Sequence, residues 1–168
     1  MVDSKKSAPQ LLLAKIQEQI ELTQRLIILI PEDKLEYRPI ENSFRICDLL
    51  GHFLEALAGF CAALYAVHPQ QLSHFLELRS LPVNHSCGIK EANQRLAQYE
   101  TCIKDGFAIL TDDDLMLIVP TVFKPEGEAL MTILLGNLEH LINHKHLLFV
   151  YLKLIGQPIS SKDLYQFR

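Results

Sequence analysis

The sequence contains no tryptophan, and its four cysteines include no pair spaced as C-x-x-C. Thiolate zinc sites and thioredoxin-like redox motifs are built from such pairs, so the sequence indicates neither. A disulfide framework is typical of shorter, loop-rich secreted chains. We therefore expect reduced and mostly buried thiols at the four cysteine positions, Cys47, Cys61, Cys87 and Cys102.

The chain also lacks an excess of positive charge. Its 16 lysines and arginines are outnumbered by 20 aspartates and glutamates, which gives a formal net charge of -4. Proteins that bind nucleic acid neutralise phosphates with a basic surface. Nucleic acid is therefore not expected as a partner of this protein.

No stretch is expected to serve as a signal peptide or a membrane span. The residues Met1–Gln10 are polar and have no apolar core. Two stretches are strongly apolar, but Cys47–Val67 contains three polar residues (Asp48, His52 and Glu55) and Leu147–Ile155 is too short to cross a bilayer. The sequence predicts a soluble, cytoplasmic protein that does not act at a membrane.

Four segments show the three- and four-residue spacing of apolar residues that is typical of helices. Pro31 ends the first, Asn42 or Ser43 is the candidate N-cap of the second, and Gly156 follows the fourth. We expect an all-α fold, a four-helix bundle with long crossover connections, formed as a single domain of residues 1–168. The expected helices are Leu11–Ile30, Phe44–Val67, Ile89–Leu110 and Glu128–Ile155.

Two of the connections carry local patterns. Gln71–Leu78 has apolar residues at helical spacing and predicts one or two extra turns of helix. Leu115–Val119 and Thr121–Phe123 are short β-favouring runs on either side of Pro120, and they predict a small ribbon.

Two histidines, His140 and His144, stand four residues apart in the last predicted helix, so both project from one face. The same face continues through Leu148, Tyr151 and Ile155 and therefore points into the core. A buried imidazole that makes no hydrogen bond costs on the order of 1–3 kcal/mol. A shared metal ion satisfies both rings, and ordinary hydrogen bonds within the core are the alternative interpretation.

A third ligand must come from another helix. His52 is the best candidate because it lies in the middle of the almost wholly apolar second helix, and Glu55 reaches the same region. His146 and Glu139 belong to the other face of the last helix and are interpreted as surface or subunit-contact residues. The three remaining histidines are not expected to bind metal: His68, His74 and His85.

Two segments together resemble the DinB-like (DinB/YfiT-like) family. From Asn137 the chain reads NLEHLINHKHLLFVYLKLIG, which resembles the family's last helix with H-x-x-x-H, a basic residue and an apolar run before a Leu-Gly-type stop. From Ile30 it reads IPEDKLEYRPIENSFRICDLLGHFLEAL, which resembles the family's Arg-Pro turn followed by a helix with a single histidine. The two motifs occur in the family's order, and they lie in the second and fourth predicted helices, with the first motif starting at the end of the first helix.

The resemblance implies a four-helix bundle in which three histidines hold a divalent metal, with His52, His140 and His144 at the matching positions. It also implies similarity to transferases that use a low-molecular-weight thiol, and a homodimer. Zinc is expected first, with nickel, iron or manganese as alternatives. The chain departs from the family pattern at four places, which leave the three ligands intact and the substrate class open: Tyr37, Phe44, His146 and Leu147.

Three imidazoles leave a coordination position open, which is typical of catalytic sites. The expected function is a metal-dependent transferase or hydrolase that activates a thiol or water for attack on a small electrophilic molecule. Glu55, Asn137 and Tyr151 are the candidate catalytic residues around the metal. The alternative is a non-catalytic metal-binding or dimerising bundle. A protein that contacts DNA is disfavoured by the net charge of -4.

Overall fold

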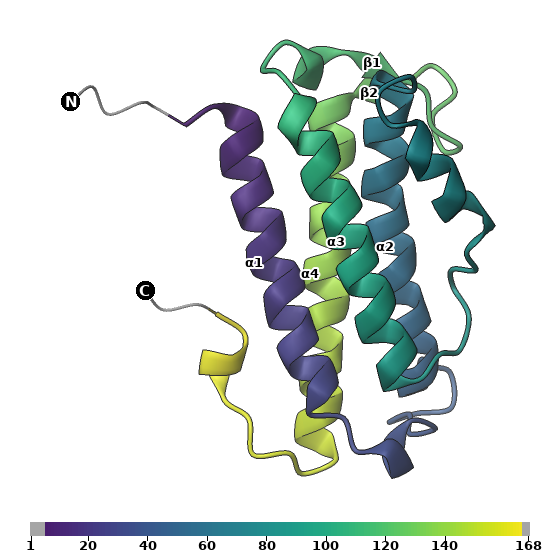
Figure 1. Cartoon of the computed structure of the whole chain (residues 1–168). Helices are drawn as coiled ribbons and strands as arrows, with labels where there is room; N and C mark the ends of the chain where they lie inside the picture. Colours follow the sequence, from purple (N-terminus) through teal and green to yellow (C-terminus); the bar gives the residue numbers. More distant parts are fainter. Residues whose placement is uncertain (1–5, 166–168) are drawn as a thin grey trace.

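The computed structural model describes residues 6–165, and within them four long helices form a bundle (Figure 1). Helix α2 packs against both α3 and α4, and α1 packs against the same two helices. The expected all-α bundle is confirmed. The helices are α1 (Ala8–Ile28), α2 (Ile46–Val67), α3 (Ile89–Ile109) and α4 (Leu130–Leu154).

The ends of the helices follow local side-chain chemistry. Ser7 caps α1, since its hydroxyl accepts from the backbone N–H of Gln10 while the Gln10 side chain accepts from that of Ser7. The expected cap of α2 was wrong: the N-cap residue is Arg45, and the helix begins at Ile46. The hydroxyl of Ser43 instead donates to the carbonyl of Ile40 at 2.8 Å, so it is engaged in the preceding turn.

Helix α2 is the centre of the core. By length and composition it is apolar enough to cross a membrane, but 56% of its most apolar 18-residue window is buried inside the protein. Its side chains Leu50, Phe53, Leu57 and Phe60 are completely buried. The apolar character of α2 is thus explained by its packing against both α3 and α4, as expected for a helix buried on several sides.

The connections carry short 3₁₀ helices and one small ribbon. The extra turns expected at Gln71–Leu78 are present as η2 (Ser73–Ser80), and the ribbon pairs β1 (Ile118–Val119) antiparallel with β2 (Glu128–Ala129). The second strand was predicted wrongly, at Thr121–Phe123. Those residues form a turn in which the N–H of Thr121 donates to the carbonyl of Lys124. The other short helices are η1 (Glu32–Lys34), η3 (Asp114–Met116) and η4 (Ser161–Asp163).

None of the four cysteines forms a disulfide, as expected. Cys47, Cys61 and Cys87 are buried, and Cys102 is half-buried. Burial in apolar surroundings raises the pKa of all four thiols above the ordinary value. The thiols therefore contribute to packing as protonated, weakly polar side chains.

Candidate metal centre

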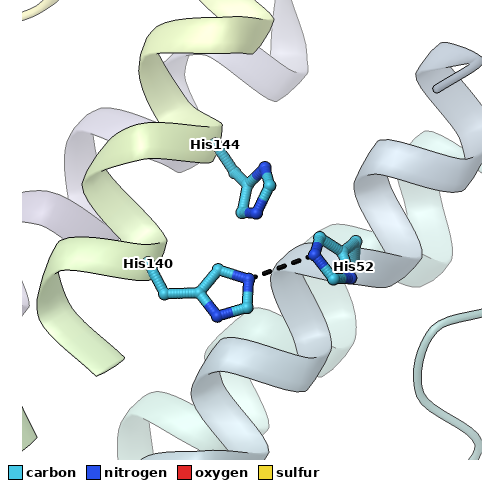
Figure 2. Close-up of side chains that lie close together, drawn as sticks. All are labelled: His52, His140 and His144. Carbon is cyan, nitrogen blue, oxygen red and sulfur yellow. Dashed lines mark hydrogen bonds between the residues drawn. The ribbon is translucent and has the colours of Figure 1, made fainter. Parts of the chain in front are cut away.

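Three imidazole rings meet between α2 and α4 (Figure 2). His140 and His144 project from successive turns of α4 towards His52 on α2, and one nitrogen of each ring lies within 4.8 Å of one nitrogen of the other two. His52 Nε2 and His140 Nε2 are 3.1 Å apart. The helical spacing and the choice of His52 as third member therefore predicted this cluster correctly as a geometric group.

The orientation of His52 is set by two side chains behind it. Its Nδ1 lies 2.8 Å from Asn84 Oδ1 and 2.8 Å from Glu55 Oε2. Both neighbours are acceptors, so Nδ1 carries the proton and Nε2 presents a lone pair to the other two histidines. Metal-binding histidines ordinarily have such a partner on the far nitrogen, because it fixes the tautomer and makes the ligand more basic.

Asn84 reaches His52 because a glycine lets the loop lie directly on α2. A Cβ at Gly51 would overlap the carbonyl group of His85, so a larger residue would push the loop away. The backbone N–H of Asn84 donates to the carbonyl of Gly51 at 3.1 Å. Asn84 has φ 60°, a left-handed conformation that asparagine tolerates better than most residues. Gly51 and the backbone of Asn84 thus place the side-chain amide of Asn84 beside the His52 ring.

Burial keeps the two α4 histidines uncharged. Desolvation lowers the pKa of His144 to about 4, with a further contribution from nearby His52, and it also lowers the pKa of His140. His144 Nδ1 is buried and has no hydrogen-bond partner in the described part of the chain. Neutral rings with free lone pairs are the form in which histidine binds metal.

The arrangement fits a divalent metal ion. Two nitrogens bound to one zinc ion at about 2.05 Å with a tetrahedral angle lie roughly 3.3 Å apart. The 3.1 Å between His52 Nε2 and His140 Nε2 is close to that value. One nitrogen from each of the three rings thus forms a donor set that could hold a divalent metal.

A cleft of about 430 Å³ opens beside the cluster. Phe44 stacks on the His52 ring with centroids 5.0 Å apart and adds an apolar wall next to it. Glu139 and Asn143 bring polar groups to the cleft from α4. The lining residues among those described are His52, Gly136, Glu139, His140, Asn143 and His144. A ligand could thus approach the three nitrogens from solvent.

The candidate catalytic residues do not all reach this cleft. Glu55 contacts the outer nitrogen of His52. Asn137 points elsewhere, because its amide packs where a side chain at Gly59 would sit. Tyr151 is 2% exposed and sets its ring edge-on to Tyr37, with centroids 6.2 Å apart. Among the described residues, the cleft lining includes none of the three: Glu55, Asn137 and Tyr151.

Glu139 was interpreted from the sequence as a residue of the opposite face, but it lines the cleft. It precedes His140 by one position, so helical phase alone places it about 100° away from that ligand. The cleft is wide enough for both Glu139 and His140 to line it. The signal that could have found it is the three- and four-residue spacing of Gly136, Glu139 and Asn143, which places them on one side of α4 next to His140.

A second group of potential metal donors is formed by the loop that carries Asn84 and by the start of α3. One donor atom each of His85, Cys87 and Glu91 lies within 4.8 Å of the others. His85 Nε2 is 2.9 Å from Glu91 Oε1, and Arg95 approaches the same carboxylate oxygen at 3.6 Å. Burial raises the pKa of the Cys87 thiol to about 12. From the sequence, His85 was not expected to bind metal and Cys87 was expected to be a buried thiol.

The fold is shared with a solved DinB-like protein. No family model matches the sequence, and no curated protein matches it. The structure is similar to that of a DinB-like protein (YjoA) from Bacillus subtilis, with a TM-score of 0.65 and 19% identity, covering 87% of this chain and 92% of that one. The similarity confirms the DinB-like fold that the two sequence motifs indicated.

Proposed function

We propose that this protein is a metal-dependent enzyme that attaches a thiol or water to a small electrophilic molecule. His52, His140 and His144 would hold one divalent ion, which would lower the pKa of a coordinated thiol or water and so make it a nucleophile near neutral pH. The observation that carries the proposal is the convergence of the three rings on one point at the side of an open cleft.

The residues around the cluster have separate tasks in this proposal. Asn84 and Glu55 hold the His52 ring by its Nδ1–H, so Glu55 acts as a positioning residue rather than as a base. Glu139 is the carboxylate that lines the cleft itself, and it would accept the proton that the nucleophile loses. Phe44 would exclude water from one side of the His52 ring.

Zinc is the proposed ion, with nickel, iron or manganese as alternatives. Imidazole nitrogen suits several of these metals, and a tetrahedral ion with three protein ligands is typical of catalytic zinc. The proposal includes a low-molecular-weight thiol as co-substrate, a cytoplasmic location and a homodimer. It includes no nucleic-acid or membrane partner.

Turnover with a model electrophile tests the enzyme proposal. Untagged protein loaded with zinc is mixed with a chloronitroaromatic compound and, in turn, a panel of low-molecular-weight thiols; a carbon–sulfur bond forms, chloride leaves, and the thiol proton goes to Glu139. We expect thiol-dependent product, and we expect Glu139→Gln to lower kcat by roughly 10²-fold with unchanged metal content. Glu126→Gln, at an exposed carboxylate outside the cleft, is the matched control.

The competing function gives a different set of results. An ion whose coordination positions are all filled by protein atoms, together with no conversion of thiol or water substrates, would identify a non-catalytic metal-binding bundle. Equal activity of the Glu139→Gln protein and the Glu126→Gln control would remove Glu139 from the mechanism while leaving the metal site in place.

A further inference from the structure

A second cavity, larger than the cleft beside the histidines, lies against another part of α2. Its volume is about 530 Å³, within the range of small-molecule sites. One wall is α2 and the other is the segment from η2 to the loop before Asn84. The lining residues are Ala58, Cys61, Ala62, Tyr65, Ala66, Phe75, Leu78, Arg79, Leu81 and Val83.

Small side chains on α2 create the space. Ala58, Ala62 and Ala66 follow one another at four-residue intervals, so they lie along a single face of the helix. The opposite wall is made of large apolar side chains, including Phe75 and Leu78. Ala62 and Ala66 are exposed, so the space is a groove open to solvent, and a helix face of alanines opposite large side chains leaves room in it for a guest.

Arg79 is the one charged residue of the described lining, and it is exposed. None of the hydrogen bonds or ion pairs found among residues 6–165 involves its guanidinium. By contrast, the other described arginines each donate to a carboxylate or carbonyl oxygen: Arg25, Arg38, Arg45 and Arg95. The cavity therefore combines an apolar wall with a positive charge at its exposed edge that has no counter-ion among residues 6–165.

We propose that this cavity binds a small amphipathic carboxylate, with its hydrocarbon part along the α2 alanines and its carboxylate on Arg79. The guanidinium can hold a carboxylate through two parallel hydrogen bonds. The three alanines span about 12 Å of helix, which suits a chain of about ten carbon atoms. This inference goes beyond the proposed function and does not depend on a metal ion at the histidines.

Decanoate and decanol, titrated calorimetrically into the full chain in the presence of a chelator, test the two parts of the site. Ala62→Phe fills the cavity from an exposed helical position, and Ala97→Phe places the same side chain at an exposed position of α3 outside it. We expect decanoate binding to weaken at least 10-fold in Ala62→Phe and to stay unchanged in Ala97→Phe. Thermal melting of both variants checks that they are folded.

Arg79→Gln tests the charge. We expect it to weaken decanoate binding about 10-fold and to leave decanol binding unchanged, because only the carboxylate uses the guanidinium. Wild-type affinity for decanoate in Ala62→Phe would overturn the cavity as the binding site. An Arg79→Gln protein that still prefers decanoate to decanol as the wild type does would overturn the carboxylate assignment. The double variant His140→Ala, His144→Ala should bind decanoate normally, which separates this result from the metal proposal.

Discussion

Two groups of side chains that could hold a metal ion lie side by side in this protein, and they differ in what surrounds them. At His52, His140 and His144 three imidazole nitrogens face one another, and the acidic and amide groups lie outside, on His52 Nδ1. At His85, Cys87 and Glu91 the carboxylate is already shared with the imidazole of His85 and the Arg95 guanidinium. In each group, the donor atoms lie within 4.8 Å of one another.

Proximity of donors is therefore not what distinguishes a candidate metal site. A cation at the second group would lie next to the positive charge of Arg95 and would have to displace the proton of a buried thiol. A cation at the first group meets three imidazole nitrogens, two of them in rings whose pKa burial lowers, those of His140 and His144. We infer that the first group binds metal and that the second is an ion-pair network which fixes the loop to α3.

Removal of donor side chains should lower the metal content of the protein at the first group and leave it unchanged at the second. His140→Ala combined with His144→Ala should abolish stoichiometric metal binding, whereas His85→Ala combined with Cys87→Ala should leave the metal content unchanged. Elemental analysis of untagged protein after dialysis against zinc measures both. The assignment of metal to the first group would be overturned if the His140→Ala, His144→Ala protein kept stoichiometric metal. It would also be overturned if only the His85→Ala, Cys87→Ala protein lost its metal.

The hydrogen-bond acceptors on His52 Nδ1 should account for a large part of the zinc affinity. Asn84→Ala removes one of the two acceptors on Nδ1, and we expect zinc affinity to fall about 10- to 100-fold. Competition with a chromophoric chelator gives the dissociation constant. Gln94→Ala, which removes an exposed side-chain amide from α3, is the control.

A second substitution at the same position separates side chain from backbone. Asn84→Gly keeps a residue that adopts φ 60° readily but removes the amide. Affinity as weak as that of Asn84→Ala assigns the effect to the lost hydrogen bond. Wild-type affinity would show that only the loop conformation matters.

Acid should destabilise the metal-free protein through His144. Its pKa is about 4 when folded and 6.5 in a model peptide, so the unfolded chain binds the extra proton first as the pH falls. The contribution is complete above pH 6.5 and is lost between there and about pH 4. We expect on the order of 1–2 kcal/mol for this half-buried ring, measured by urea unfolding with chelator present. His144→Gln should flatten this part of the pH profile.

The smallest effect is expected at the second group. Glu91→Gln breaks a partly exposed ion pair with His85 and Arg95 and should lower the free energy of unfolding by less than about 1 kcal/mol. Zinc affinity should remain that of the wild type. A large loss of affinity would mean that the two groups act as one site.

The sequence was sufficient for the features that depend on helical phase. His140 and His144 share a face because they are one turn apart, and the apolar context of His52 placed it in the same interior. Asn84 could not be found in this way, because its position depends on a loop that crosses α2 only where Gly51 leaves space. The pairing of Ile118 with Ala129 was missed for a similar reason, since a two-residue ribbon has too little pattern to define its partner.

The contact between His52 and His140 joins residues that are 88 positions apart in the chain. Closing so long a loop costs conformational entropy, and no local segment can assemble this donor set before the bundle forms. Any ion held there would bind only the folded protein, so it would shift the folding equilibrium by mass action, by about 2.7 kcal/mol at a free concentration one hundred times the dissociation constant. The melting temperature of the bundle would then depend on the free metal concentration.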